Sequence, residues 1–303
     1  YRWSDKVYAD LFEQAGKLRD RALKVCLPQK GAGSKGASIT VFNSLSWTRT
    51  GLVEFEGKLP NGNFVLLDED GAQVPLQRLG ANRIVFKAED VPPLGWTTYS
   101  LVSGESEAEP VGDVTADVHS MENEFIRVEL TARGTLQRIY DKRFGREGLP
   151  QGAEANVLQF FEDFPHVWEA WDIDPEYTAN ASPLCGPVDH LREISLGELA
   201  SGVEVTRSIG ESSRITQTYL LFAGAPRLDI HTHIEWREQR RLLRALFPVD
   251  VRSRIATHEI AFGHIQRPAH RSNPWDQAMF EVCSHRWVDL SEPGFGVALL
   301  NDG

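Results

Sequence analysis

The apolar positions near the start of the chain recur at the spacing of one face of an α-helix. Ser4 or Asp5 can cap this helix and Pro28 ends the pattern, so the spacing predicts a helix over 4–25. Because a single helix cannot bury its own apolar stripe, we expect residues 1–30 to be the remnant of a helical bundle. The stripe consists of Val7, Leu11, Ala15, Leu18, Ala22 and Val25.

The pattern changes to short β-rich runs from residue 38 onward. Turn residues such as Asn61-Gly62 and Asp70-Gly71 separate the runs, and no helical period lies between them. Regular short strands of this kind are typical of a small sandwich, which we expect over 38–103. The predicted strands are 38–42, 51–55, 64–67, 83–86 and 97–102.

Residues 104–118 are acidic and poor in large apolar side chains, and we interpret them as a linker between domains. Longer β runs joined by polar loops follow it, which predicts a large two-sheet sandwich over 119–303, truncated at its C-terminal end. The whole chain is therefore expected to be mainly β. The predicted strands are 124–130, 135–140, 203–207, 213–222, 227–236, 245–251, 257–262, 278–282 and 296–300.

Composition narrows the class of partners. The 303 residues carry 32 Lys+Arg against 43 Asp+Glu, a net charge of −11, which disfavours nucleic acid and anionic membranes as partners. No apolar run approaches the roughly 18 residues of a membrane span. The 3 cysteines show no metal spacing, so a reducing, cytoplasmic setting is expected. Since Tyr1 is not an initiating Met, we expect a fragment of a longer protein.

The segment 160–177 is the strongest candidate for chemistry, because carboxylates alternate there with aromatic rings. Aromatic planes stack on the C–H faces of sugars and carboxylates accept their hydroxyl hydrogen bonds, which favours a carbohydrate subsite. If 168–174 is extended, Trp168, Asp172 and Asp174 share one face of the strand. The alternative is a structural loop whose tryptophans anchor it to the core.

Two further groups of residues could bind ligands. Arg267 and His270 lie in a proline-punctuated loop over 263–276, which is either a binding loop or an ordinary hydrogen-bonded one. His231 and His233 have a spacing that zinc sites use, but no third ligand is evident, so a solvent-facing pair is favoured. Cys283 and His285 form a weaker candidate for a catalytic pair.

Several long motifs resemble the α-mannosidases of glycoside hydrolase family 38, in the branch that includes cytosolic and vacuolar enzymes. This resemblance implies the domain order of a catalytic α/β barrel, a three-helix bundle, a small β domain and a large sandwich similar to galactose-mutarotase-like domains. The chain would begin within the bundle and stop within that supersandwich. The motifs lie at 91–99, 161–174, 242–251, 267–292 and 296–302.

The resemblance implies a retaining, zinc-dependent hydrolase of terminal α-mannosides. The family's nucleophile, acid/base carboxylate and zinc ligands lie outside this segment, so we assign no catalytic or metal-binding residue here and expect the 303-residue chain alone to be inactive. By position in the motifs, one wall of the glycone pocket is expected from this chain. Its members are Trp168, Glu169, Trp171, Asp172, Arg267 and His270, with Glu169 standing where the family usually has Asp.

The expected partners are therefore a mannose-containing oligosaccharide or glycoside and the protein's own N-terminal barrel, with a homo-oligomer as a further option. Zinc is expected in that barrel and not on this chain. A free-standing carbohydrate-binding sandwich is the main alternative. A mutarotase-like epimerase ranks last, because it needs a His and a Glu that converge on a sugar and no motif here supplies them.

Overall fold

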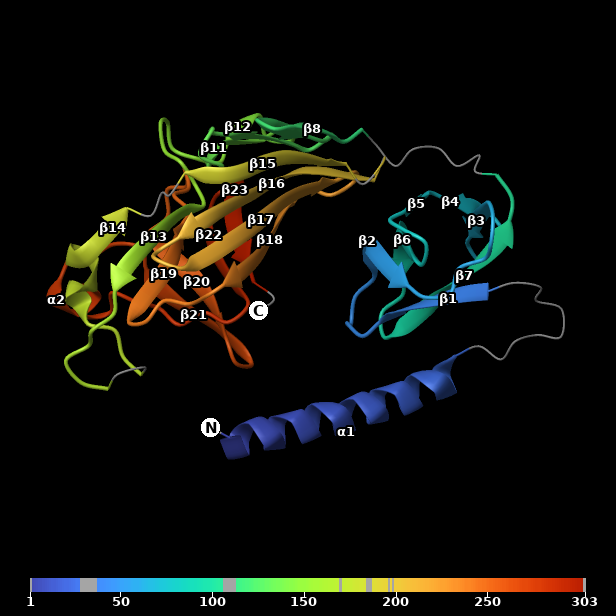
Figure 1. Cartoon of the computed structure of the whole chain (residues 1–303), viewed down its shortest axis with the longest axis horizontal. Coiled ribbons are helices and arrows are strands. Elements are labelled where there is room, and N and C mark those ends of the chain that lie inside the picture. Colours follow the sequence, from blue (N-terminus) through green and yellow to red (C-terminus); the bar gives the residue numbers. More distant parts are fainter. Residues whose placement is uncertain are drawn as a thin grey trace. The chain divides into compact units, whose positions relative to one another are not determined.

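A computed structural model describes residues 2–27, 37–105, 113–168, 171–183, 187–195, 197 and 199–301. One long helix precedes a succession of antiparallel strands (Figure 1). The chain divides into two compact units, Tyr1–Glu109 and Pro110–Gly303. The prediction of a mainly β chain that begins with a helix is confirmed. No helix in the described part of the chain is long and apolar enough to cross a membrane.

Helix α1 spans Arg2–Cys26 and agrees with the predicted helix. Asp5 lies in its first turn and Lys24 in its last, which is the favourable arrangement with respect to the helix dipole. None of its residues is buried, and Trp3 and Phe12 are each 77% exposed. Its apolar stripe is thus formed as predicted but left open.

Two facing sheets enclose the core of the small unit. Their orders are β1-β7-β3-β4 and β2-β6-β5. Phe86 and Tyr99 meet edge to face in this core, with ring centroids 5.0 Å apart. The strands are β1 Ala37–Asn43, β2 Arg49–Glu56, β3 Phe64–Leu67, β4 Gln73–Val74, β5 Leu76–Arg78, β6 Arg83–Val91 and β7 Gly95–Ser103.

The main core of the large unit lies between two sheets, β12-β11-β10-β9-β8 and β15-β16-β17-β18. Val128, Val203 and Tyr219 are fully enclosed there. Burial raises the pKa of Tyr219 to about 12. The strands are β8 Thr115–Asp117, β9 Ser120–Glu122, β10 Ile126–Leu130, β11 Leu136–Asp141, β12 Arg146–Glu147, β15 Val188–Ser195, β16 Ala200–Ile209, β17 Ser213–Phe222 and β18 Leu228–Glu235.

Two further sheets complete the large unit, with the orders β14-β13-β19 and β21-β20-β22-β23. A second core cluster joins β13 and β19 to β16 and β17. The remaining elements are β13 Val157–Glu162, the 3₁₀ helix η1 Pro175–Asn180, β14 Ala181–Pro183, β19 Arg241–Leu246, β20 Ile255–Ile260, β21 Gly263–Pro268, α2 Pro274–Ala278, β22 Trp287–Glu292 and β23 Phe295–Leu300.

Two predicted strands are wrong. The strand expected over 245–251 ends at Leu246, near Pro248, which has no amide to donate, and it begins earlier, opposite β13. The strand expected over 278–282 does not form: Ala278 is the last residue of the short helix α2, which Asn273 caps, and 279–282 are not part of a strand.

Candidate functional site

The loop 164–174 carries the strongest predicted site residues between β13 and η1. The side chains of Trp168 and Trp171 are 72% and 84% exposed, and Asp172 is also exposed. The carbonyl of Trp168 accepts the amides of Trp171 at 2.7 Å and Asp172 at 3.1 Å, so the backbone turns here and is not extended as the shared-face interpretation required. Glu169 lies outside the described residues.

An ion pair closes this loop. The backbone amide of His166 donates to Asp174 Oδ2 at 2.8 Å, and the ring Nδ1 lies 2.5 Å from the same oxygen. The hydrogen bond and the charge of Asp174 raise the pKa of His166. The same contacts from His166 lower the pKa of Asp174. These contacts connect the described residues 164–168 and 171–174 to each other, and the indoles of Trp168 and Trp171 are both exposed.

Of the second predicted group, Arg267 lies in β21, opposite Ala256 of β20, and His270 follows the end of that strand, so the segment expected as a loop over 263–276 begins with a strand. Asn273 Oδ1 accepts the amides of Trp275 and Asp276, both at 3.0 Å, and Asn273 Nδ2 donates to Asp276 Oδ2 at 2.7 Å. His270 Nδ1 is hydrogen-bonded to Ser272 Oγ at 2.9 Å and lies 3.4 Å from that carboxylate oxygen. The buried Asp276 thus links the cap of α2 to the predicted imidazole.

A hollow of about 230 Å³ lies beside α2. Within the described part of the chain, the Arg267 guanidinium has no carboxylate partner. Burial lowers the pKa of His258, and the positive charge of Arg267 lowers it further. A free guanidinium donates hydrogen bonds and the carboxylate of Asp276 accepts them, so the lining suits a polyhydroxylated ligand. The hollow is lined by Arg267, Pro268, Ala269, His270, Arg271, Asp276, Met279, Phe280 and Val282.

The two predicted segments meet at Tyr177, which is 7% exposed. Its ring packs against Phe161 with centroids 5.0 Å apart and against Phe280 at 6.4 Å. Its hydroxyl donates to Glu281 Oε1 at 2.6 Å, and Arg244 pairs with the same carboxylate at 2.7 Å. Figure 1 shows β14, which follows η1, and α2 at the same end of the large unit.

Tyr177, Arg244 and Glu281 were not among the predicted site residues. Tyr177 ends the acid- and aromatic-rich segment 160–177 and Glu281 lies inside a family motif, so both were within reach of the sequence signal. Arg244 also lies inside a family motif, over 242–251, but its contact with this group depends on the pairing of β19 with β13.

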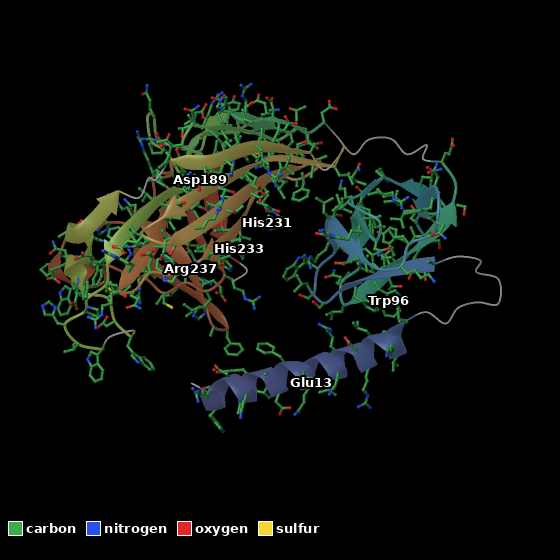
Figure 2. The ribbon with its side chains drawn as sticks, in the orientation of Figure 1. Glu13, Trp96, Asp189, His231, His233 and Arg237 are labelled. Atoms are coloured by element: carbon green, nitrogen blue, oxygen red, sulfur yellow. The ribbon has the colours of Figure 1, made fainter. Side chains whose placement is uncertain are left out.

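The other histidine and cysteine candidates lie elsewhere. His231 and His233 are exposed on β18, opposite Thr218 and Thr216, away from the end that carries α2 (Figure 2). Cys283 Sγ lies 3.7 Å from His285 Nε2 and is exposed. Over the described residues, no three His, Cys, Asp or Glu side chains gather in a way that could hold a metal ion.

Comparisons with known proteins agree with this architecture. Residues 121–303 match the model of the Glycosyl hydrolases family 38 C-terminal domain. The human protein Alpha-mannosidase 2C1 is 41% identical over 191 residues, which cover 63% of this chain and 18% of that protein. Alpha-mannosidase G of Dictyostelium discoideum is 35% identical over 195 residues, with the same coverage of 63% and 18%.

A solved structure supports the fold over more of the chain. The crystal structure of an alpha-mannosidase from Enterococcus faecalis V583 superposes with a TM-score of 0.72 at 16% identity, covering 96% of this chain and 40% of that one. At this identity the likeness concerns the fold alone. The chain spans about a fifth of the length of the curated relatives it matches.

Proposed function

The chain belongs to glycosyl hydrolase family 38, with residues 121–303 as its C-terminal domain, and from this we propose that it is part of an α-mannosidase that hydrolyses terminal α-mannosides with retention. In this proposal the chain supplies one wall of the glycone pocket. The reacting carboxylates belong to a catalytic barrel outside the chain, so the 303 residues alone are inactive.

One observation supports the proposal most directly, namely that both indoles of the loop 164–174 are exposed beside the exposed carboxylate of Asp172. Large aromatic side chains are usually mostly buried, because exposing them forgoes the free energy of burial. Exposed indoles next to an acid offer a flat face for sugar C–H groups and an acceptor for hydroxyls.

Each wall residue has a specific role in this proposal. Trp168 and Trp171 stack on the sugar, and Asp172 accepts a hydroxyl hydrogen bond. Arg267 donates to a ring or hydroxyl oxygen, and His270, whose Nδ1 is hydrogen-bonded to Ser272 Oγ, adds a further polar contact. Glu169 belongs to the same proposed wall.

Zinc in this proposal assists catalysis by binding sugar hydroxyls in the barrel. The described residues of this chain do not fit such an ion, since they bring no three suitable ligands together. No step is therefore assigned to a metal on this chain. We further propose a cytoplasmic location, which is compatible with free, exposed Cys26 and Cys283.

We also propose how the chain divides into domains. We infer that residues 1–30 form part of a helical bundle, because the apolar stripe of α1 is exposed and needs partner helices. Residues 38–103 are the first β domain. The second begins before the predicted residue 119, because β8 at Thr115–Asp117 already pairs with β9, so the linker expected over 104–118 is shortened to 104–114.

The test is a kinetic comparison in the full-length enzyme. Trp168→Ala and Asp172→Ala should each lower kcat/KM for an α-mannoside about tenfold, the equivalent of one lost contact worth about 1.4 kcal/mol. Trp47→Ala, which removes an indole that is 59% exposed in the small unit, is the control and should change neither kinetics nor stability. Unchanged kinetics in both loop variants would defeat the wall assignment.

A second candidate is a binding module that holds carbohydrate without the barrel. The exposure of both indoles on this chain alone favours it enough to test. Calorimetric titration of the 303-residue chain with mannose and mannobiose separates the two. Saturable binding that disappears in Trp171→Ala supports the module, and no binding supports a wall that works only against the barrel.

A further inference from the structure

We propose that Tyr177, Glu281 and Arg244 form a positioning lock that fixes the direction of the loop 164–174 relative to the hollow beside Arg267. The functional part of this inference rests on the proposed glycone wall. The contacts among Tyr177, Glu281 and Arg244 can be tested on this chain without measuring enzyme activity.

The loop needs an external anchor because its own hydrogen bonds are local. The carbonyl of Trp168 accepts from residues three and four positions later, and His166 pairs with Asp174 across the loop. These bonds join the described residues 164–168 and 171–174 to each other and do not fix their direction. At the N-terminal end of the loop, the Arg240 guanidinium lies 5.1 Å from the centre of the Phe164 ring. Trp168, Trp171 and Asp172 are all exposed, so their side chains contribute little burial that could hold it. The direction must therefore be set where the loop joins the rest of the unit.

Tyr177 is the anchor at the C-terminal end of the loop. Its amide donates to the carbonyl of Asp174 at 3.1 Å, so the position of the ring is coupled directly to the last residue of the loop. The ring packs between Phe161 of β13 and Phe280, and it is 7% exposed. Burial of an aromatic ring of this size contributes a few kcal/mol, so the ring holds η1 in place.

The hydroxyl of Tyr177 gives the anchor its direction. It donates to Glu281 Oε1 at 2.6 Å, while Arg244 donates to both oxygens of the same carboxylate at 2.7 and 3.3 Å. The Arg244 guanidinium also lies 5.5 Å from the centre of the Tyr177 ring. Each of the three residues therefore contacts the other two. Because Arg244 sits in β19 opposite Gln159 of β13, a rigid sheet supports the group.

Glu281 is coupled to the hollow beside Arg267 through its two neighbours in the sequence. Phe280 and Val282, one on each side of it, line the hollow together with Arg267 and His270. A shift of Glu281 would therefore move one side of the hollow and the root of the loop at once. The hydrogen bond from Tyr177 keeps the two predicted groups of sugar-binding residues in one fixed relation, which makes these three positioning residues and not catalytic ones.

The first test is amide hydrogen exchange on the 303-residue chain with Tyr177→Phe, which keeps the ring and removes only the hydroxyl. Tyr219→Phe is the matched control, because it removes a buried hydroxyl that bonds Asn156 and the Gly134 carbonyl elsewhere in the large unit. We expect exchange over 164–174 to accelerate about tenfold in Tyr177→Phe and to stay unchanged in Tyr219→Phe, on the scale of one hydrogen bond. Equal effects in both variants, or none in either, would overturn the lock.

A second variant keeps the proposal testable if Tyr177→Phe folds poorly. Glu281→Gln retains an acceptor for the hydroxyl but loses the ion pair, and Glu281→Ala loses both, so exchange should rise in the order wild type, Gln, Ala. In the full-length enzyme, Tyr177→Phe should raise KM for a mannoside with little change in kcat. Faster loop exchange in a protein without mannosidase activity would retain the lock and reject the proposed function.

Discussion

Asp174 Oδ2 accepts two contacts from His166, one from the backbone amide at 2.8 Å and one from ring Nδ1 at 2.5 Å. One carboxylate thus closes the loop that carries Trp168 and Trp171. The His166 ring is exposed, so this pair is a modest interaction that salt weakens. Because both partners titrate, the contact between His166 and Asp174 is strongest over a limited pH range.

The first prediction concerns that range. The pKa of His166 is raised by Asp174, so its contribution is complete below the ordinary pKa near 6.5 and is lost as the pH rises through the higher pKa of the folded state. The pKa of Asp174 is lowered, so its contribution is present above its ordinary pKa near 3.8 and is lost as the pH falls through the lower folded value. Closure should be strongest between about pH 4 and 6.5.

NMR titration of the histidine signals checks this. Asp174→Asn should return the pKa of His166 to its usual range, with the wild-type protein as the comparison. A His166 pKa that is insensitive to Asp174→Asn would contradict the pairing. Loop amides should also exchange faster at pH 8 than at pH 6, after correction for the intrinsic rate.

The second prediction concerns Asn123, a buried side chain that replaces missing backbone partners in the large unit. Its Nδ2 donates to the carbonyls of Phe222 and Ala225 at 2.8 and 2.9 Å, and its Oδ1 accepts the amides of Phe125 and Ile126, both at 2.9 Å. Asn123→Ala leaves these buried groups unsatisfied and should lower the free energy of unfolding by about 2–4 kcal/mol. Urea unfolding measures it, with the exposed Asn61→Ala as a control expected within about 0.5 kcal/mol of wild type.

The third prediction uses two glycines in strands with opposite surroundings. A Cβ on Gly202 of β16 would lie 1.9 Å from the carbonyl oxygen of Tyr219, on the backbone of the neighbouring strand. A Cβ on Gly51 of β2 would meet nothing within 4 Å. Gly202→Ala should therefore cost at least about 3 kcal/mol of unfolding free energy, while Gly51→Ala should be neutral or stabilise by about 0.5 kcal/mol. Similar melting temperatures for the two variants would contradict the close approach of β16 and β17.

Alternation in the sequence predicted several strands that have one more buried and one more exposed face, although β21, which also alternates, was expected to be part of a loop. Strand β17 agrees with the prediction at both ends, and β10 is shorter by two residues at its start. Strand β13 was missed, because Phe160 and Phe161 are both buried and no alternation remains between them. Alternation of apolar and polar residues appears only when one face of a strand is buried and the other is exposed. A strand that is buried on both faces therefore shows no alternation.

The predicted site shows the same limit. Its two segments could be found because acids, aromatic rings and arginines stand out in a sequence. Their meeting point could not, since Tyr177 and Glu281 are 104 positions apart and their contact depends on how β13, β19 and α2 pack. The turn at Trp168 was equally hidden, because its φ of 62° is unusual for a bulky residue.

The fourth prediction separates the two roles of Asn273. Its Oδ1 caps α2 by accepting the amides of Trp275 and Asp276, and its Nδ2 donates to the buried carboxylate of Asp276 at 2.7 Å. Asn273→Ser keeps an acceptor for the cap and loses the carboxylate contact. Asn273→Asp keeps the cap but sets a second negative charge against Asp276. Asn273→Ala loses both contacts and should cost about 1–2 kcal/mol.

These differences predict a pH signature that a simple cap would not give. The Asp variant should be less stable than the Ser variant at pH 7, because two like charges face each other within hydrogen-bonding distance. It should recover as the pH falls and one carboxyl takes up a proton, whose hydroxyl can then donate to the other as Nδ2 does in the native chain. Thermal unfolding from pH 4 to 7 measures the crossing. If the Asp and Ser variants keep the same order at every pH, the contact between Asn273 and Asp276 is not what shapes this side of the hollow.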